Sequence, residues 1–149
     1  MTNLQVPFII NGQESHTSSS FDVVSPITGE KVHRGGVATE ADAISAVNSA
    51  AKSFKDWRHV SPSDRRDILF KAAALLIERQ DELVAYMVDE IGSPRGYAIH
   101  NVIKSAELIR DVAGRISSLQ GFVPTCADRD LTAIVVKEPY GVVLAIAPW

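Results

Sequence analysis

The alternation of hydrophobic and polar positions divides the chain into three blocks: short strands, then helices, then strands again. Phe8-Ile9-Ile10 runs into Asn11-Gly12, a pair that favours a tight hairpin because both positions tolerate a positive φ. We predict the return strand near Phe21–Val24, after a polar stretch of serines and threonines. The next predicted elements are a turn at Pro26–Gly29 and a short strand that begins around Lys31-Val32 and ends at Gly35-Gly36.

Apolar residues spaced three and four apart predict four helices in the middle block. Thr39 is a good N-cap for the first helix, and Glu40 and Asp42 follow in its first turn, where carboxylates suit the helix dipole. Ser61-Pro62 begins the second helix, with serine as the cap and proline at the first helical position. The expected buried faces are Ala41, Ile44, Val47, Ala51, Phe54 and Trp57 in the first helix, and Ile68, Leu69, Ala72, Leu75 and Leu76 in the second.

The third predicted helix begins near Asp81, and Gly92 with Pro94 ends it. A longer fourth helix runs from about Arg95 to Leu119 and ends before Gly121. The expected buried face of the third helix is Leu83, Val84, Met87, Val88 and Ile91. That of the fourth helix is Ala98, Val102, Ala106, Ile109, Ala113 and Ile116.

The last block is rich in strand-forming residues. Leu131–Glu138 contains many β-branched side chains, Pro139-Tyr140-Gly141 interrupts the pattern, and Val142–Ala147 is apolar at every position. Such a run suits a strand covered on both faces, as in a parallel sheet flanked by helices. A strand of this kind needs neighbours and a helical crossover, so we expect the sequence to be the opening part of a larger α/β fold. The alternative is a small α/β domain that ends on a buried antiparallel strand.

Composition excludes several classes of protein. The chain has 149 residues, 46% of them hydrophobic and 22% charged, which is typical of a globular protein. A net charge of −3 offers no broad basic surface for nucleic acid or membranes, and no apolar run reaches the roughly 18 residues of a membrane helix. The start lacks the features of a secretory signal, and the single cysteine, Cys126, excludes an internal disulfide framework. We therefore expect a cytoplasmic protein.

Few residues form a catalytic or metal-binding pattern. The four histidines are scattered, without the spacing of a metal site, and neither a Walker A, a G-x-S-x-G nor a G-x-G-x-x-G motif occurs. Cys126 lies in a predicted loop without a recognisable base beside it, so we do not expect it to be a nucleophile. Asp89 and Glu90 are adjacent on a helix and therefore point apart.

Several stretches, in order, resemble one enzyme family. Phe8–Gly12 followed by Val24–Glu30 resembles the opening of an NAD(P)-dependent aldehyde dehydrogenase. The helical stretch is similar as well, and Lys137–Trp149 resembles the family's most recognisable stretch in this region. The match spans essentially the whole chain and about the first third of a complete family member. Within the family, Ser61–Arg66 and the Glu90-Ile91-Gly92 linker look most like the aromatic aldehyde branch, of the salicylaldehyde or vanillin type.

The resemblance implies a domain organisation. Residues 1–121 would form the N-terminal part of the NAD(P)-binding domain, as short hairpins and a four-helix block. Residues 122–139 would be a β-arm that packs across subunits, so a homodimer or homotetramer is expected. Residues 140–149 would be the first buried strand of a Rossmann-like parallel sheet, truncated in this sequence.

The resemblance also implies a reaction, the oxidation of an aldehyde to its carboxylic acid with NAD or NADP. In the family a cysteine thiolate attacks the aldehyde, the resulting thiohemiacetal gives hydride to the nicotinamide, and a glutamate activates water. These catalytic residues lie beyond this chain, and the family's oxyanion asparagine directly follows the Pro-Trp pair. We therefore assign no catalytic residue here, and we expect the chain alone to be inactive.

Two groups of residues remain as candidate binding sites. Ile146, Ala147, Pro148 and Trp149 match the family segment that runs under the cofactor and offers it backbone and apolar contact. Tyr97 and Asn101, four apart on the fourth helix, match the helix that lines the substrate funnel, where an aromatic ring can stack on an aromatic substrate. The alternatives are that Pro-Trp only ends a strand and that Tyr97 is an ordinary surface residue. At the level of the whole chain, the alternative to an enzyme is a catalytically inactive helical or oligomerisation module.

Overall fold

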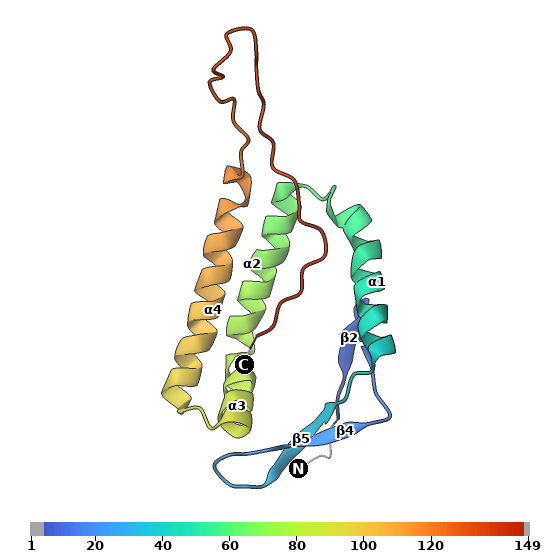
Figure 1. Cartoon of the computed structure of the whole chain (residues 1–149). Coiled ribbons are helices and arrows are strands. Elements are labelled where there is room, and N and C mark those ends of the chain that lie inside the picture. The colour runs from blue at the N-terminus through green and yellow to red at the C-terminus, as the bar shows by residue number, and fades with distance from the viewer. Residues whose placement is uncertain (1–4, 148–149) are drawn as a thin grey trace.

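A computed structural model describes residues 5–147 as two small sheets, a helical block and a long C-terminal excursion (Figure 1). The strands are β1 (Gln5–Val6), β2 (Phe8–Ile10), β3 (Gln13–Ser15), β4 (Ser20–Val24) and β5 (Lys31–Gly36). The helices are α1 (Glu40–Trp57), α2 (Pro62–Glu78), α3 (Gln80–Ile91) and α4 (Arg95–Arg115), and α4 continues into a short 3₁₀ turn, η1 (Ile116–Ser118).

The predicted hairpin forms, but its return strand lies elsewhere. Asn11 and Gly12 have φ values of 55° and 71°, and they turn β2 directly into β3, with Phe8 opposite Ser15. The prediction of a return strand near Phe21–Val24 was wrong, because a two-residue turn pairs the residues that follow it immediately. Phe21–Val24 instead belongs to β4, which pairs antiparallel with β5 in a sheet of order β1-β5-β4.

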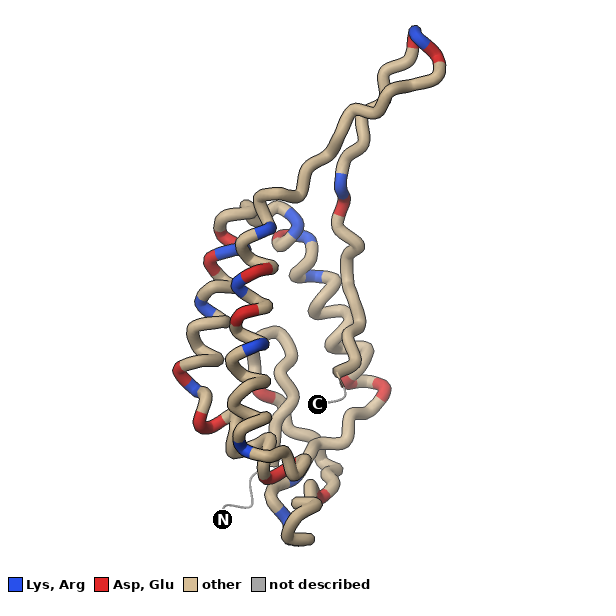
Figure 2. The backbone as a smooth tube through the Cα atoms, turned by 90° about the vertical axis from the view of Figure 1, so that its left-hand side faces the viewer, with Lys and Arg blue, Asp and Glu red and all other residues tan. Residues whose placement is uncertain are grey.

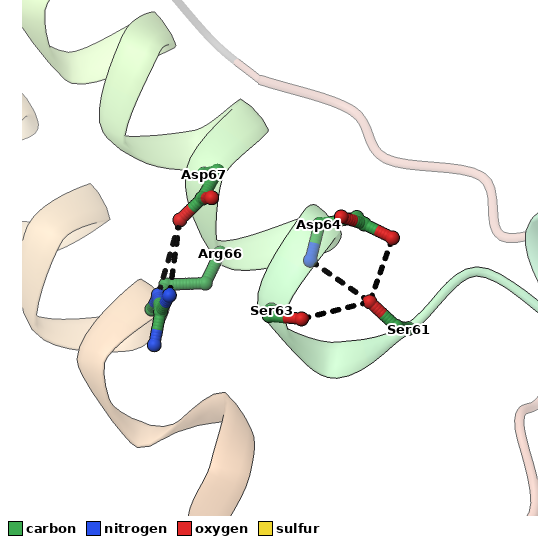
Figure 3. Close-up of polar contacts among 5 residues, drawn as sticks. All are labelled: Ser61, Ser63, Asp64, Arg66 and Asp67. Carbon is green, nitrogen blue, oxygen red and sulfur yellow. Dashed lines mark hydrogen bonds and ion pairs between the residues drawn. The ribbon is translucent and has the colours of Figure 1, made fainter.

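The predicted helix starts are confirmed by their caps. Thr39 accepts a hydrogen bond from the Asp42 N–H at 3.2 Å, and the Asp42 carboxylate accepts one from the Thr39 N–H at 2.8 Å. These bonds from Thr39 hold the pKa of Asp42 below its usual value. At α2, the Ser61 hydroxyl accepts from the Asp64 N–H at 3.1 Å and donates to the Asp64 carboxylate at 2.7 Å (Figure 3).

The core lies where α4 runs beside α2 and α3 (Figure 1). The predicted apolar stripe of α4 is confirmed, since its alanines are fully buried and allow the helix backbones to approach closely. Val84 of α3 is also fully buried, and it packs with Ala98 and Val102 of α4. The buried hydrophobic residues are Ala73, Val84, Ala98, Val102, Ala106 and Ala113.

The predicted buried face of α1 was wrong for the described chain. Ile44 and Val47 are each more than half exposed, and α1 contains no buried residue. The same holds for part of α2, where Ala73 is buried but Ile68 and Leu75 are about half exposed. The physical reason is that an amphipathic stripe is buried only if another element packs on it, and within residues 5–147 none covers these side chains.

The two strands predicted near the C-terminus do not form in the described part of the chain. Residues 122–139, which we call the arm, project beyond the helices and are joined only at their base by an isolated bridge between Phe122 and Val135 (Figure 1). Residues 140–147, the C-terminal segment, return alongside α1 without strand pairing, and Leu144 and Ile146 are largely exposed. A strand needs a hydrogen-bonded neighbour, and residues 5–147 provide none for this segment. The alternative of a buried antiparallel strand is therefore wrong as well.

The three-stranded sheet β1-β5-β4 is attached to the helical block at the C-terminus of α3. Gly92 ends α3 in the left-handed conformation, with φ 68°, as predicted for the residue that stops this helix. The turn between β4 and β5 lies against it, so that a Cβ at Gly92 would be 3.1 Å from Pro26 Cγ and 3.2 Å from Ile27 Cγ1. Beside this contact, His33 of β5 is only 8% exposed, and its Nε2 atom lies 3.3 Å from the Glu90 carboxylate.

This attachment predicts that Gly92→Ala lowers the free energy of unfolding. A non-glycine residue in the left-handed region costs roughly 1–2 kcal/mol, and the added methyl group also presses on Pro26 and Ile27. Chemical denaturation followed by circular dichroism measures the change. Gly96→Ala is the matched control, because Gly96 lies in α4 with open space around it, and we expect its stability to be unchanged or slightly raised. Equal stability of the two variants would contradict this account of the attachment.

Candidate functional site

An apolar hollow with a volume of about 410 Å³ lies between α3 and α4, at the end of α2. Apolar side chains from all three helices form most of its wall, and Asn101, Ser105 and Glu90 place polar atoms among them. A concave, mostly apolar site with a few polar groups is the usual form of a small-molecule site. The lining residues are Leu76, Leu83, Tyr86, Met87, Glu90, Ile91, Asn101, Val102 and Ser105.

The structure brings only one of the two predicted funnel residues to this hollow. Asn101 is half-buried and lines it, and its side-chain amide donates a hydrogen bond to the Tyr97 carbonyl oxygen at 3.2 Å. Tyr97 lies one turn earlier on α4, is 52% exposed and is not among the lining residues. The two residues therefore share a helix, but only Asn101 faces the hollow.

Glu90 is a lining residue that the sequence did not single out for this position. It lies in the last turn of α3, and its carboxylate faces the buried imidazole of His33 at 3.3 Å from Nε2. In the sequence, His33 is one of four scattered histidines, and Glu90 stands out only beside Asp89 and in the Glu90-Ile91-Gly92 linker. The contact joins a strand and a helix that are far apart in the sequence, and no local pattern signals it.

A second hollow, with a volume of about 300 Å³, lies where the C-terminal segment passes α1. Gly141, Val142 and Val143 form one side of it, and Phe54 and Trp57 from the last turns of α1 form the other. The segment carries no charge, whereas charged residues mark the helices and the tip of the arm (Figure 2).

The C-terminal segment also carries the residues expected at the cofactor. Ile146 is 85% exposed and Ala147 is exposed, and both lie beyond the contact with α1. Among residues 5–147, no backbone hydrogen bond involves residues 136–147. Pro148 and Trp149 lie outside the described residues.

The other chemical candidates add little. Cys126 is half-buried in the arm, with its sulfur 4.0 Å from the Pro124 carbonyl oxygen. Within the described range, histidine, cysteine and acidic side chains do not gather in groups of three or more that would hold a metal ion. No helix among residues 5–147 is long and apolar enough to cross a membrane.

Comparison with known protein families and sequences gives one consistent result. The model of the aldehyde dehydrogenase family matches residues 13–149. A vanillin dehydrogenase from Pseudomonas sp. (strain HR199) is 37% identical over 146 residues, which cover 97% of this chain and 30% of the relative. A salicylaldehyde dehydrogenase from Pseudomonas putida is 29% identical over 136 residues, which cover 91% of this chain and 28% of the relative. The chain thus spans less than a third of the length of these curated relatives.

Solved structures show the same relationship. The crystal structure of a salicylaldehyde dehydrogenase from Pseudomonas putida G7, complexed with salicylaldehyde, matches 91% of this chain and 28% of its own, with a TM-score of 0.83 and 28% identity. An NAD-dependent aldehyde dehydrogenase from Sinorhizobium meliloti matches 89% of this chain and 28% of its own, with a TM-score of 0.82 and 28% identity. The predicted fold class, the N-terminal part of the α/β aldehyde dehydrogenase fold, is therefore confirmed. By the family match over residues 13–149 and this fold, the chain belongs to the aldehyde dehydrogenase family.

Proposed function

We propose that the protein containing these residues oxidises an aromatic aldehyde to its carboxylic acid with NAD or NADP, through a cysteine thiohemiacetal formed outside this chain. The family match over residues 13–149 is the observation that carries the proposal. The aromatic substrate is supported by relatives that are named vanillin and salicylaldehyde dehydrogenases. A nicotinamide cofactor is supported by the NAD-dependent relative from Sinorhizobium meliloti.

In this proposal the C-terminal segment holds the dinucleotide, which supplies a hydride acceptor when bound. The exposed side chain of Ile146 and the exposed Ala147 fit this role, because they offer apolar surface to a ribose or nicotinamide ring. Their backbone groups, which make no hydrogen bond within residues 5–147, can bond to the ligand. Pro148 and Trp149 continue the same segment.

The hollow between α3 and α4 is the part of the chain that we propose lies toward the aldehyde. Its wall is mostly apolar, which suits an aromatic ring, and the Asn101 amide provides a hydrogen bond donor for a ring substituent. Tyr97 lies outside the hollow, so in this proposal it contacts a substrate only at the entrance.

The proposal also includes a homodimer or homotetramer, joined through the arm. The arm exposes the apolar side chains of Leu131, Ile134 and Val136, and within the described chain its only strand pairing is the Phe122–Val135 bridge. Unpaired strand-like segments of this kind are normally covered by a partner. A cytoplasmic location completes the proposal, and the free thiol of Cys126 fits a reducing compartment.

The activity is tested on the product of the complete reading frame. We expect reduction of NAD or NADP that depends on vanillin or salicylaldehyde, with a higher kcat/KM than for an aliphatic aldehyde, because the apolar hollow favours a ring. Cofactor fluorescence measures the rate. The 149-residue chain is the control, and we expect no turnover from it.

Two results would contradict this proposal. Turnover by the 149-residue chain would show that the catalytic residues lie within it. No turnover by the complete product with any aldehyde would favour the alternative of a catalytically inactive interaction module.

Self-association through the arm is tested by adding charge to its apolar side chains. We expect the 149-residue chain to form oligomers in light scattering, and the double variant Ile134→Asp/Val136→Asp to shift toward monomer, because a charge cannot be buried unpaired in an interface. Thr132→Asp is the control, since it adds a carboxylate at an exposed polar position of the arm, one where the double variant adds two. A monomeric parent chain, or an equal effect of Thr132→Asp, would argue against the arm as the interface.

A further inference from the structure

Two arginines cover the two aromatic rings at the end of α1. The guanidinium carbon of Arg58 lies 5.5 Å from the centroid of the Phe54 ring. That of Arg65, from the first turn of α2, lies 5.4 Å from the Trp57 ring. A guanidinium over an aromatic face is attracted by the ring quadrupole, and the attraction grows when the pair is shielded from water. Each of the two rings that line the hollow beside the C-terminal segment is therefore stacked with an arginine guanidinium.

Arg65 also closes the C-terminal end of α1. Its Nη2 donates to the Trp57 carbonyl oxygen at 2.9 Å and to the Arg58 carbonyl oxygen at 3.0 Å. The last carbonyls of a helix lack partners within the helix, so these two bonds fix the end of α1 to the start of α2. Stacking on the ring and bonding to the carbonyls together need a planar, multidentate cation, which a lysine ammonium is not.

The Nε atom of Arg65 is enclosed, although the side chain as a whole is half-buried. Nε is buried and has no hydrogen bond partner within residues 5–147. An unsatisfied buried donor lowers stability, so the position of the guanidinium is set by its contacts with Trp57 and the two carbonyls rather than by complete satisfaction of its donors.

The C-terminal segment approaches α1 beside those same rings. Phe54 and Trp57 face Gly141, Val142 and Val143 across the second hollow. No backbone hydrogen bond involves residues 136–147 within the described chain. On the α1 side Phe54 comes close to the segment, since a Cβ at Gly141 would lie 4.0 Å from Phe54 Cε1, so side chains of α1 are the groups available to hold it.

We propose that Arg65 is a positioning residue for the C-terminal segment: by fixing the Trp57 indole, it holds Gly141–Val143 in place and thereby directs Ile146 and Ala147 toward the dinucleotide. The first part of this inference stands on the contacts of Arg65 and Trp57. The second part rests on the proposed function, which assigns the dinucleotide to Ile146 and Ala147.

The neighbouring arginine provides a matched control. Arg66 carries the same charge in the same turn of α2, but its guanidinium turns to Asp67, with Nη2 3.2 Å from the carboxylate (Figure 3). It makes no contact with the Trp57 ring or with the carbonyls at the end of α1. Exposed ion pairs of this kind contribute little to stability.

The experiment follows the methyl resonances of Val142 and Val143 by NMR in the 149-residue chain without dinucleotide. If the segment is held beside Phe54 and Trp57, we expect the ring currents of these side chains to displace the resonances from their random-coil positions. We expect Arg65→Gln to remove more than half of that displacement and Arg66→Gln to leave it unchanged. The methyl resonances of Val84 and Val102, which report on the α3–α4 core, should stay in place in both variants.

A double-mutant comparison separates action through Trp57 from a general structural role. If Arg65 acts through the indole, the Val142 and Val143 resonances of the Trp57→Ala variant do not change further when Arg65→Gln is added. The inference is overturned if Arg65→Gln leaves these resonances unchanged, if Arg66→Gln moves them equally, or if the effects of Arg65→Gln and Trp57→Ala add. Because the samples contain no dinucleotide, failure of the proposed oxidation would leave this result intact, and the reverse also holds.

Discussion

The packing of α4 against α2 and α3 is the contact on which the rest of the structure depends. Fully buried alanines on α4 let the helices approach, and Val84 and Val102 fill the space between them. Two further parts of the chain are attached to this block at the ends of its helices. The small sheet joins at Gly92, after α3, and α1 joins through Arg65, at the start of α2. The three helices therefore place the first hollow, and α1, joined to α2 through Arg65, places the second together with the C-terminal segment.

The described residues leave much apolar surface uncovered, and the residues that we propose to bind the cofactor lie on that surface. Side chains such as Ile44, Ile68 and Leu75 are about half exposed, and Ile146 is almost fully exposed. Contiguous apolar surface on a protein marks a site of interaction. The relatives are more than three times as long as this chain, which agrees with further contacts made outside residues 5–147. In the proposed function, the described residues accordingly form one wall of the site rather than an enclosed site.

Local signals predicted the elements well and the long-range contacts poorly. Thr39 and Ser61 mark helix starts by their own hydrogen bonds, and the stripe of α4 is buried as its spacing indicates. The strand at Val142–Ala147 fails because a strand is made by its neighbour, which this chain does not supply. The contacts of Arg65 with Trp57 and of His33 with Glu90 join separate elements, so the spacing of residues along the sequence does not predict them. Of the predicted site residues, Asn101 lines a hollow, Tyr97 does not, and Pro148 and Trp149 lie outside the described residues.

We propose that the C-terminal segment, which lies beside α1, forms part of the dinucleotide site of an aldehyde-oxidising enzyme. A crystal structure of the complete protein with bound NAD or NADP tests this placement. We expect the nicotinamide half of the cofactor to lie in van der Waals contact with Ile146 and Ala147, while Gly141–Val143 remain beside Phe54 and Trp57. A cofactor bound away from this segment, with Ile146 and Ala147 covered by protein alone, would contradict it.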